Sequence, residues 1–129
     1  MINKFDQKTC KELKDAVMRA LGSVGDQYGV KFLDKSGNFT DSTMSFRIEA
    51  AIIRDGQVLS REAEDFKNYT YRHGLKESDL FREFVCDGKT FKLVGYSTRA
   101  RKFPMIAREV ATDEEYTFSI ASIKYHLDN

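Results

Sequence analysis

The sequence predicts an α+β fold, in which an N-terminal helix–β-hairpin–helix unit packs with a small antiparallel, SH3-like β-domain. In the N-terminal part, apolar residues first recur at three- and four-residue steps, which predicts a helix, and then alternate with polar residues, which predicts strands. Beyond a second helical segment, short apolar runs between turn residues predict short strands. We expect the first unit over residues 1–75 and the β-barrel-like unit over 76–129. No Ser/Gly-rich linker separates them, so one compact domain is the alternative.

The composition limits the classes of protein to consider. The chain has 129 residues, of which 41% are hydrophobic and 32% charged, so it is long enough for one domain or two very small ones. Its 10 Phe and 6 Tyr supply the apolar surface that disordered chains lack. The formal charge of +1 excludes a uniformly basic DNA coat or an acidic DNA mimic.

The first helix is predicted from a capping pattern and an apolar stripe. Thr9 and Glu12 have the S/T-x-x-E spacing of a capping box, so we expect the helix to begin there and to end at Gly29. The stripe that should face a core consists of Cys10, Leu13, Val17, Leu21, Val24 and Tyr28.

A β-hairpin and a second helix should follow. Residues 30–33 are a short strand candidate, and Asp34 to Gly37 has the composition of a turn. Residues 43–52 alternate between apolar and polar side chains, as in a strand with one buried face, and Asp55-Gly56 marks a tight turn. Ser60 is placed to cap a helix that runs to about His73 and is closed by Gly74.

The C-terminal part consists of short segments. Residues 84–86, 90–96, 103–110 and 116–118 are the strand candidates, with a hairpin turn at Asp87-Gly88. Ile120, Ile123 and Leu127 indicate a terminal helical turn.

No targeting or membrane segment is evident, so we expect a cytoplasmic protein. Residues 1–6 lack the apolar region of a signal peptide, and no stretch approaches the ~18 apolar residues of a membrane-spanning helix. Cys10 and Cys86 fit this compartment as buried free thiols, whereas a disulfide would suit an oxidising one.

Catalytic and cofactor motifs are not found. Cys10, His73, Cys86 and His126 occur singly, without the spacing of a metal site, and no phosphate-binding glycine loop is present. His73 is better explained by its place at a helix C-terminus, and Glu62, Glu64 and Asp65 by theirs at an N-terminus. We therefore expect no cofactor and no enzymatic activity; a small enzyme using His73, His126 or a carboxylate pair is the minor alternative.

The most distinctive segment is basic and carries aromatic residues. Residues 97–110 hold four cations against Glu109, while residues 111–129 hold Lys124 against four acids. Guanidinium groups beside aromatic rings are typical of nucleic-acid contacts. The predicted nucleic-acid or partner site consists of Tyr96, Ser97, Thr98, Arg99, Arg101, Lys102, Phe103 and Arg108. The alternative is that these cations pair with Asp113, Glu114 and Glu115.

Four segments carry a resemblance to a known group of proteins. They are Thr9-Cys10-Lys11-Glu12-Leu13, Arg61-Glu62-Ala63-Glu64-Asp65-Phe66, Gly74-Leu75-Lys76 and Gly95-Tyr96-Ser97-Thr98-Arg99-Ala100-Arg101-Lys102-Phe103-Pro104. In their order the chain resembles, over nearly its whole length, small and mostly uncharacterised proteins of tailed bacteriophages. The resemblance implies a phage protein made in the cytoplasm of a bacterial host, and it supplies no catalytic residues.

Two functions follow as hypotheses. The first is a non-enzymatic phage accessory protein that contacts nucleic acid or a nucleoprotein machine through the basic loop 97–108. The alternative is a protein–protein inhibitor of a host defence or host enzyme, of the anti-CRISPR kind, or a virion or assembly component. The sequence does not predict an oligomeric state.

Overall fold

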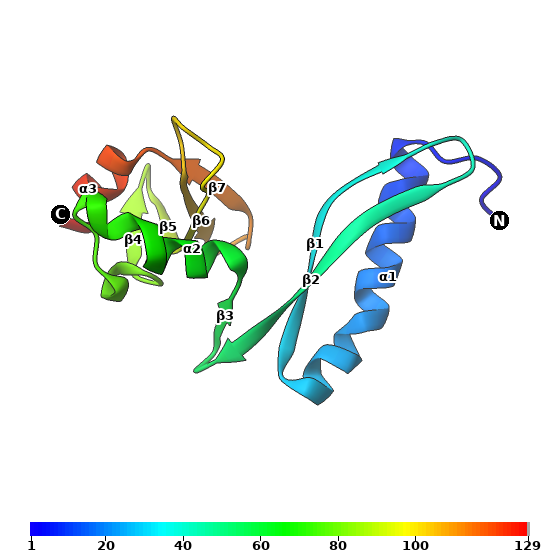
Figure 1. The fold of residues 1–129 in the computed structure, drawn as a ribbon, viewed down its shortest axis with the longest axis horizontal. Helices are drawn as coiled ribbons and strands as arrows, with labels where there is room; N and C mark the ends of the chain where they lie inside the picture. The colour runs from blue at the N-terminus through cyan, green and yellow to red at the C-terminus, as the bar shows by residue number, and fades with distance from the viewer. Residues whose placement is uncertain (129) are drawn as a thin grey trace. The chain divides into compact units, whose positions relative to one another are not determined.

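The computed structural model describes residues 1–128 and divides into two compact units, Met1–Val58 and Leu59–Asn129 (Figure 1). The chain starts with α1 (Gln7–Tyr28), β1 (Val30–Phe39), β2 (Met44–Arg54) and β3 (Gln57–Leu59). It continues with α2 (Arg61–Tyr69) and the short 3-10 helices η1 (Thr70–His73) and η2 (Glu77–Asp79). The last elements are β4 (Glu83–Cys86), β5 (Lys89–Tyr96), β6 (Met105–Glu109), β7 (Glu115–Phe118) and α3 (Ile120–Asp128).

The predicted α+β class is confirmed, with an N-terminal helix followed by a β-hairpin. The boundary between units lies at Val58/Leu59, earlier than the boundary we expected near residue 75, because α2 packs against β5. The SH3-like closure is not confirmed. The C-terminal sheet has the order β4-β5-β6-β7, and within residues 1–128 no pairing joins β7 back to β4.

Helix α1 begins earlier than its sequence pattern predicts. Asp6 is the N-cap: its carboxylate accepts the backbone N–H of Thr9 at 2.8 Å, and the Thr9 hydroxyl accepts the N–H of Asp6 at 2.9 Å. The Thr9–Glu12 box was therefore wrong, since Thr9 is the third helical residue and completes a box with Asp6. The hydrogen bond from Thr9 also lowers the pKa of Asp6. The predicted stop at Gly29 is confirmed, with φ of 70°.

The hairpin turn also lies elsewhere than expected. Strand β1 runs through Asp34 and Gly37, where the register with β2 shifts at a bulge, and the turn falls between β1 and β2, where Thr40 N–H donates to Thr43 O at 2.8 Å. A Cβ at Gly37 would overlap Ser45 O and lie 2.6 Å from Phe46 Cβ. Gly37, which fits a turn by its place in the sequence, therefore permits close strand approach instead.

Packing in the first unit brings α1 onto β1 (Figure 1). A Cβ at Gly25 would lie 2.6 Å from Val30 O and 3.6 Å from Phe32 Cδ2, so only glycine allows the helix this close to the strand. Among the large apolar residues of the predicted α1 stripe, Leu13, Val24 and Tyr28 are exposed. The apolar stripe of α1 is therefore wider than the part of the helix that β1 covers.

The second unit contains the hydrophobic core of the described residues. Phe66 of α2, Leu93 of β5, Met105 of β6 and Ile123 of α3 have no exposed surface and belong to one cluster. The β4–β5 turn forms as predicted, with positive φ at Asp87 and Gly88. The expected terminal turn is a full helix, α3, because its apolar residues reach this cluster.

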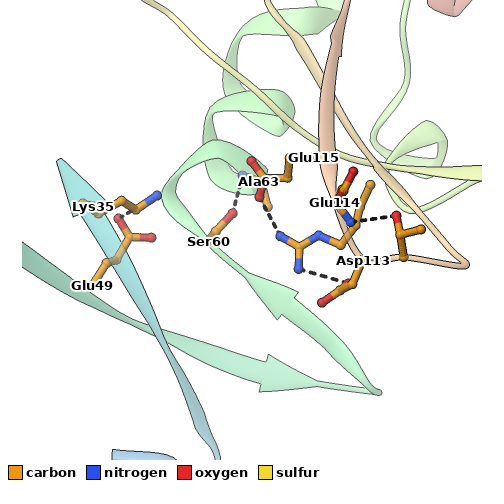
Figure 2. Close-up of polar contacts among 9 residues, drawn as sticks. Lys35, Glu49, Ser60, Ala63, Asp113, Glu114 and Glu115 are labelled. Carbon is orange, nitrogen blue, oxygen red and sulfur yellow. Dashed lines mark hydrogen bonds and ion pairs between the residues drawn. The ribbon is translucent and has the colours of Figure 1, made fainter. Parts of the chain in front are cut away.

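Helix α2 is capped by Ser60, as predicted. The Ser60 hydroxyl accepts the N–H of Ala63 at 3.2 Å (Figure 2), and η1 ends at Gly74, with φ of 83°. Within residues 1–128, no helix combines the length and the apolar character that crossing a membrane requires. Both cysteines are free and half-buried.

We expect Ser60→Ala to lower the free energy of unfolding of the second unit by about 1 kcal/mol, because the Ala63 N–H loses its acceptor. Urea unfolding followed by circular dichroism measures the change. Ser60→Asp is the matched control, since an aspartate can accept the same hydrogen bond and should retain the stability. Equal loss in both variants would contradict the capping role.

Candidate nucleic-acid interface

The predicted basic segment forms the connection between β5 and β6. Its base is closed by a hydrogen bond from Ser97 N–H to Pro104 O at 2.8 Å, directly beyond the paired residues Tyr96 and Met105. Pro104 is buried, whereas residues 98–103 are exposed. The loop 97–104 is therefore anchored at both ends and presents its middle residues to solvent.

Three cations of the loop carry uncompensated charge. Arg99, Arg101 and Lys102 are exposed, and none of them forms an ion pair with another residue in the part of the chain that the structure describes. Lys102 Nζ lies 5.9 Å from the centre of the Phe103 ring, and 49% of Phe103 is exposed. The loop thus combines positive charge with an accessible aromatic face.

Arg108 is placed differently from the other predicted cations. Its guanidinium contacts Asp113 at 3.4 Å and Glu115 at 2.6 Å (Figure 2). Across the sheet, Arg108 lies between Lys92 of β5 and Glu115 of β7 in register. Arg108 therefore pairs with Asp113 and Glu115, as the alternative predicted. Its charge is neutralised on the surface of the sheet.

An open hollow lies beside the loop in the second unit. It has a volume of about 320 Å³ and is lined by Arg61, Asp65, Tyr69, Arg72, Tyr96 and Thr98. Tyr96 and Thr98 belong to the predicted site, while the other four come from α2 and η1. No aliphatic side chain is among these lining residues, so the hollow offers charge, hydroxyl groups and aromatic rings.

Close packing between α2 and β5 places the two halves of the hollow together. A Cβ at Gly95 would lie 2.6 Å from Glu62 Cβ and 2.9 Å from the Glu62 carbonyl carbon. Only glycine at this position allows α2 to lie against the end of β5, next to the start of the loop. The isolated Gly95 in a strand is thus a site of close backbone approach.

Electrostatic contacts hold the arginine side chains that line the hollow on the side of α2 and η1. Arg61 Nε donates to the buried carboxylate of Asp65 at 3.3 Å, and this hydrogen bond raises the pKa of Arg61. The guanidinium of Arg72 lies 5.7 Å from the centre of the Tyr69 ring. Arg61 is thus held by a partner, while Arg72 stacks near an exposed aromatic ring.

Our sequence reasoning missed Arg61, Tyr69 and Arg72 as site residues. The four residues Arg61, Asp65, Tyr69 and Arg72 follow i, i+4, i+8 and i+11 spacing, which would place them on one face of the single helix predicted to run to about His73. That spacing was visible in the sequence. The contact between α2 and Gly95, which makes this face part of the site, was not.

Chemically, this surface is suited to binding anions and flat rings. Among residues 1–128 no cluster of three His, Cys, Asp or Glu is arranged to hold a metal ion. His73 lies near Tyr96, with ring centres 6.4 Å apart, but outside the residues that line the hollow. The loop exposes guanidinium and ammonium groups, and the hollow adds guanidinium and phenol groups beside the carboxylate of Asp65. Guanidinium and ammonium groups contact phosphates, and phenol rings stack on bases.

Comparison with known proteins places the chain in a family. It is 21% identical over 127 residues to an uncharacterised protein, y4mA of Sinorhizobium fredii, covering 95% of this chain and 89% of that relative. No solved structure matches the chain. The resemblance to tailed-bacteriophage proteins stays a prediction. The model of the Y4mA C-terminal domain matches residues 62–129, which contain the loop 97–104 and most of the hollow's lining residues, so the chain belongs to the Y4mA C-terminal domain family.

Proposed function

We propose that this protein is a non-enzymatic binding module that holds single-stranded nucleic acid against the loop 97–104 and the adjoining hollow. The observation that carries the proposal is the exposure of Arg99, Arg101 and Lys102 without an acidic partner in residues 1–128. Such cations are free to contact phosphates and to release the counterions condensed on a nucleic acid.

Aromatic side chains favour a single strand over a duplex as the ligand. Phe103 is half-exposed on the loop, and Tyr69 and Tyr96 line the hollow. Unpaired bases can stack on such rings, whereas paired bases cannot reach them. The open, polar hollow also suits a polymer that passes over the surface better than a small substrate that must be enclosed.

The resemblance to small tailed-bacteriophage proteins adds a setting to this proposal. It implies a protein made in the cytoplasm of a bacterial host, whereas contact with nucleic acid or a nucleoprotein machine is inferred from the charge and the aromatic residues of the loop. The near balance of 21 basic and 20 acidic residues is compatible with this function, because the cations of the loop are concentrated in one place.

The test is the salt dependence of binding to a fluorescent single-stranded oligonucleotide, measured by anisotropy. We expect the triple substitution Arg99→Ala, Arg101→Ala and Lys102→Ala to weaken binding and to reduce the slope of log K against log salt by about 2. Each lost phosphate contact removes roughly 0.7 from that slope for a single strand.

The control removes the same charge elsewhere. Lys8, Lys31 and Lys76 are exposed, and their triple replacement by alanine should leave the slope unchanged. Weaker binding to a duplex of the same sequence would support the role of the aromatic rings. No binding at low salt, or equal slopes for both triple variants, would contradict the proposal.

The alternative remains a protein–protein inhibitor of a host defence or host enzyme, or a virion or assembly component. The same loop variants distinguish it. If they abolish retention of a bacterial protein that survives nuclease treatment, while the unaltered chain binds no oligonucleotide, the loop is a protein-binding surface.

A further inference from the structure

One edge of strand β2 is largely open in the first unit. Strand β2, with 11 residues, pairs along one edge with the 10-residue β1, whereas β3, on its other side, has only 3 residues. Over the rest of that second edge, no strand of residues 1–128 pairs with β2. An open edge of this length is a template for pairing with another strand.

The hydrogen bonds to β1 identify which residues of β2 face the open edge. Ile53 N–H donates to Gly29 O at 3.1 Å, and Thr43 O accepts from Thr40 N–H, so odd-numbered residues direct their backbone groups toward the β1 side. Backbone direction alternates along a strand. Phe46, Ile48 and Ala50 therefore direct their N–H and C=O groups to the open edge.

The side chains beside this edge are apolar and incompletely covered. Phe32, which lies near Gly25 of α1, is in register with Ala50, so the even-numbered residues of β2 share the face that carries α1. Because α1 packs mainly on β1, Ile48 remains 41% and Ile52 53% exposed. The outer part of this face has no partner within the described chain.

We propose that a second copy of this chain pairs antiparallel with the open edge, about a two-fold axis at Ile48. Residues that direct hydrogen-bonding groups outward must face one another in such a pair, so the axis passes through a residue and not between two residues. An axis at Arg47 or Glu49 would place that charge opposite its own copy. An axis at Ile48 places Arg47 opposite Glu49 of the second copy, and Glu49 opposite its Arg47. An axis at Phe46 or Ala50 brings neither charge opposite its complement.

Charge complementarity therefore selects this register. Arg47 and Glu49 would form the non-hydrogen-bonded pairs, in which Cα atoms lie about 4.5 Å apart and side chains come closest. Glu49 lies 3.9 Å from Lys35 of the same chain (Figure 2), so Arg47 of the other copy would add a second cation beside a carboxylate that already has one. On the opposite face, the two Ile48 side chains would pack together beside Phe46 and Ala50.

The experiment measures the mass of the full chain by sedimentation equilibrium. We expect a dimer of about twice 14.9 kDa. Arg47→Glu and Glu49→Lys each place like charges at both symmetric contacts, and each should raise the dimer dissociation constant about tenfold. An equimolar mixture of the two variants should restore dimerisation, because every contact between unlike copies then joins opposite charges.

Arg19→Glu on α1 is the control, since it makes the same charge change on an exposed residue of the same unit and should leave the dimer intact. Amide exchange gives a second readout: the N–H groups of Phe46, Ile48 and Ala50 should lose protection in Arg47→Glu, while those of Glu49 and Ala51 keep it. That pattern also demonstrates that the variant remains folded. A monomeric chain, a dimer insensitive to both reversals, or a mixture that fails to dimerise would overturn the proposal.

Discussion

Phe66→Ala is expected to lower the free energy of unfolding of the second unit by about 3–5 kcal/mol, because the substitution removes a large core side chain and leaves a cavity. Phe66 has no exposed surface and belongs to the cluster with Leu93, Met105 and Ile123. It also joins α2 to the sheet. Loss of this side chain should therefore loosen the core together with α2, which carries Arg61 and Tyr69 and continues into η1 with Arg72.

Urea unfolding measures this effect, and Phe103→Ala is the matched control. Phe103 is the same residue type, but it lies on the loop and is 49% exposed, so its removal should change stability by less than about 0.5 kcal/mol. It should instead weaken binding of single-stranded nucleic acid. Equal destabilisation by the two substitutions would contradict the placement of the core.

Gly95→Ala is expected to destabilise the second unit by about 1–3 kcal/mol, since the added methyl group would lie 2.6 Å from Glu62 Cβ and must displace α2 or β5. The effect should extend to binding, because the same displacement separates Tyr96 and Thr98 from the α2 residues of the hollow. Thermal unfolding and the oligonucleotide anisotropy assay measure the two consequences.

Gly22→Ala is the control for this substitution. Gly22 lies within α1, and a Cβ there would have no atom within 4 Å, so alanine should stabilise the first unit by about 0.5–1 kcal/mol through its higher helix propensity. Opposite signs for the same chemical change would demonstrate that space, and not backbone preference, decides the effect at Gly95. A stabilising Gly95→Ala would contradict the close approach of α2 and β5.

Local patterns were sufficient to predict most elements. The hydroxyl of Ser60, the glycines at 29 and 74 and the Asp87-Gly88 turn each act within a few residues, and all four form as expected. The errors arose where the same signals serve another purpose. Gly37 permits a strand contact instead of a turn, and Thr9 completes a box that Asp6 begins.

The candidate site was only partly visible in the sequence. Charge counting found Arg99, Arg101 and Lys102, which are exposed, but it also included Arg108, whose charge is taken up by Asp113 and Glu115. Which cations find an acid depends on strand register, and Arg108 lies opposite Glu115 on β7. Counting charged residues along the sequence does not reveal which residues the strand register places opposite each other.

The sequence by itself determined the α+β class, the caps and most turns, and the presence of a basic, aromatic loop between two strands, because these depend on residues close together in the chain. Only the tertiary structure decided that α2 and η1 contribute Arg61, Tyr69 and Arg72 to the surface beside that loop, that the units divide at Val58/Leu59, and that one edge of β2 stays largely open. The physical reason is that these features depend on contacts between distant segments, such as the approach of Glu62 to Gly95.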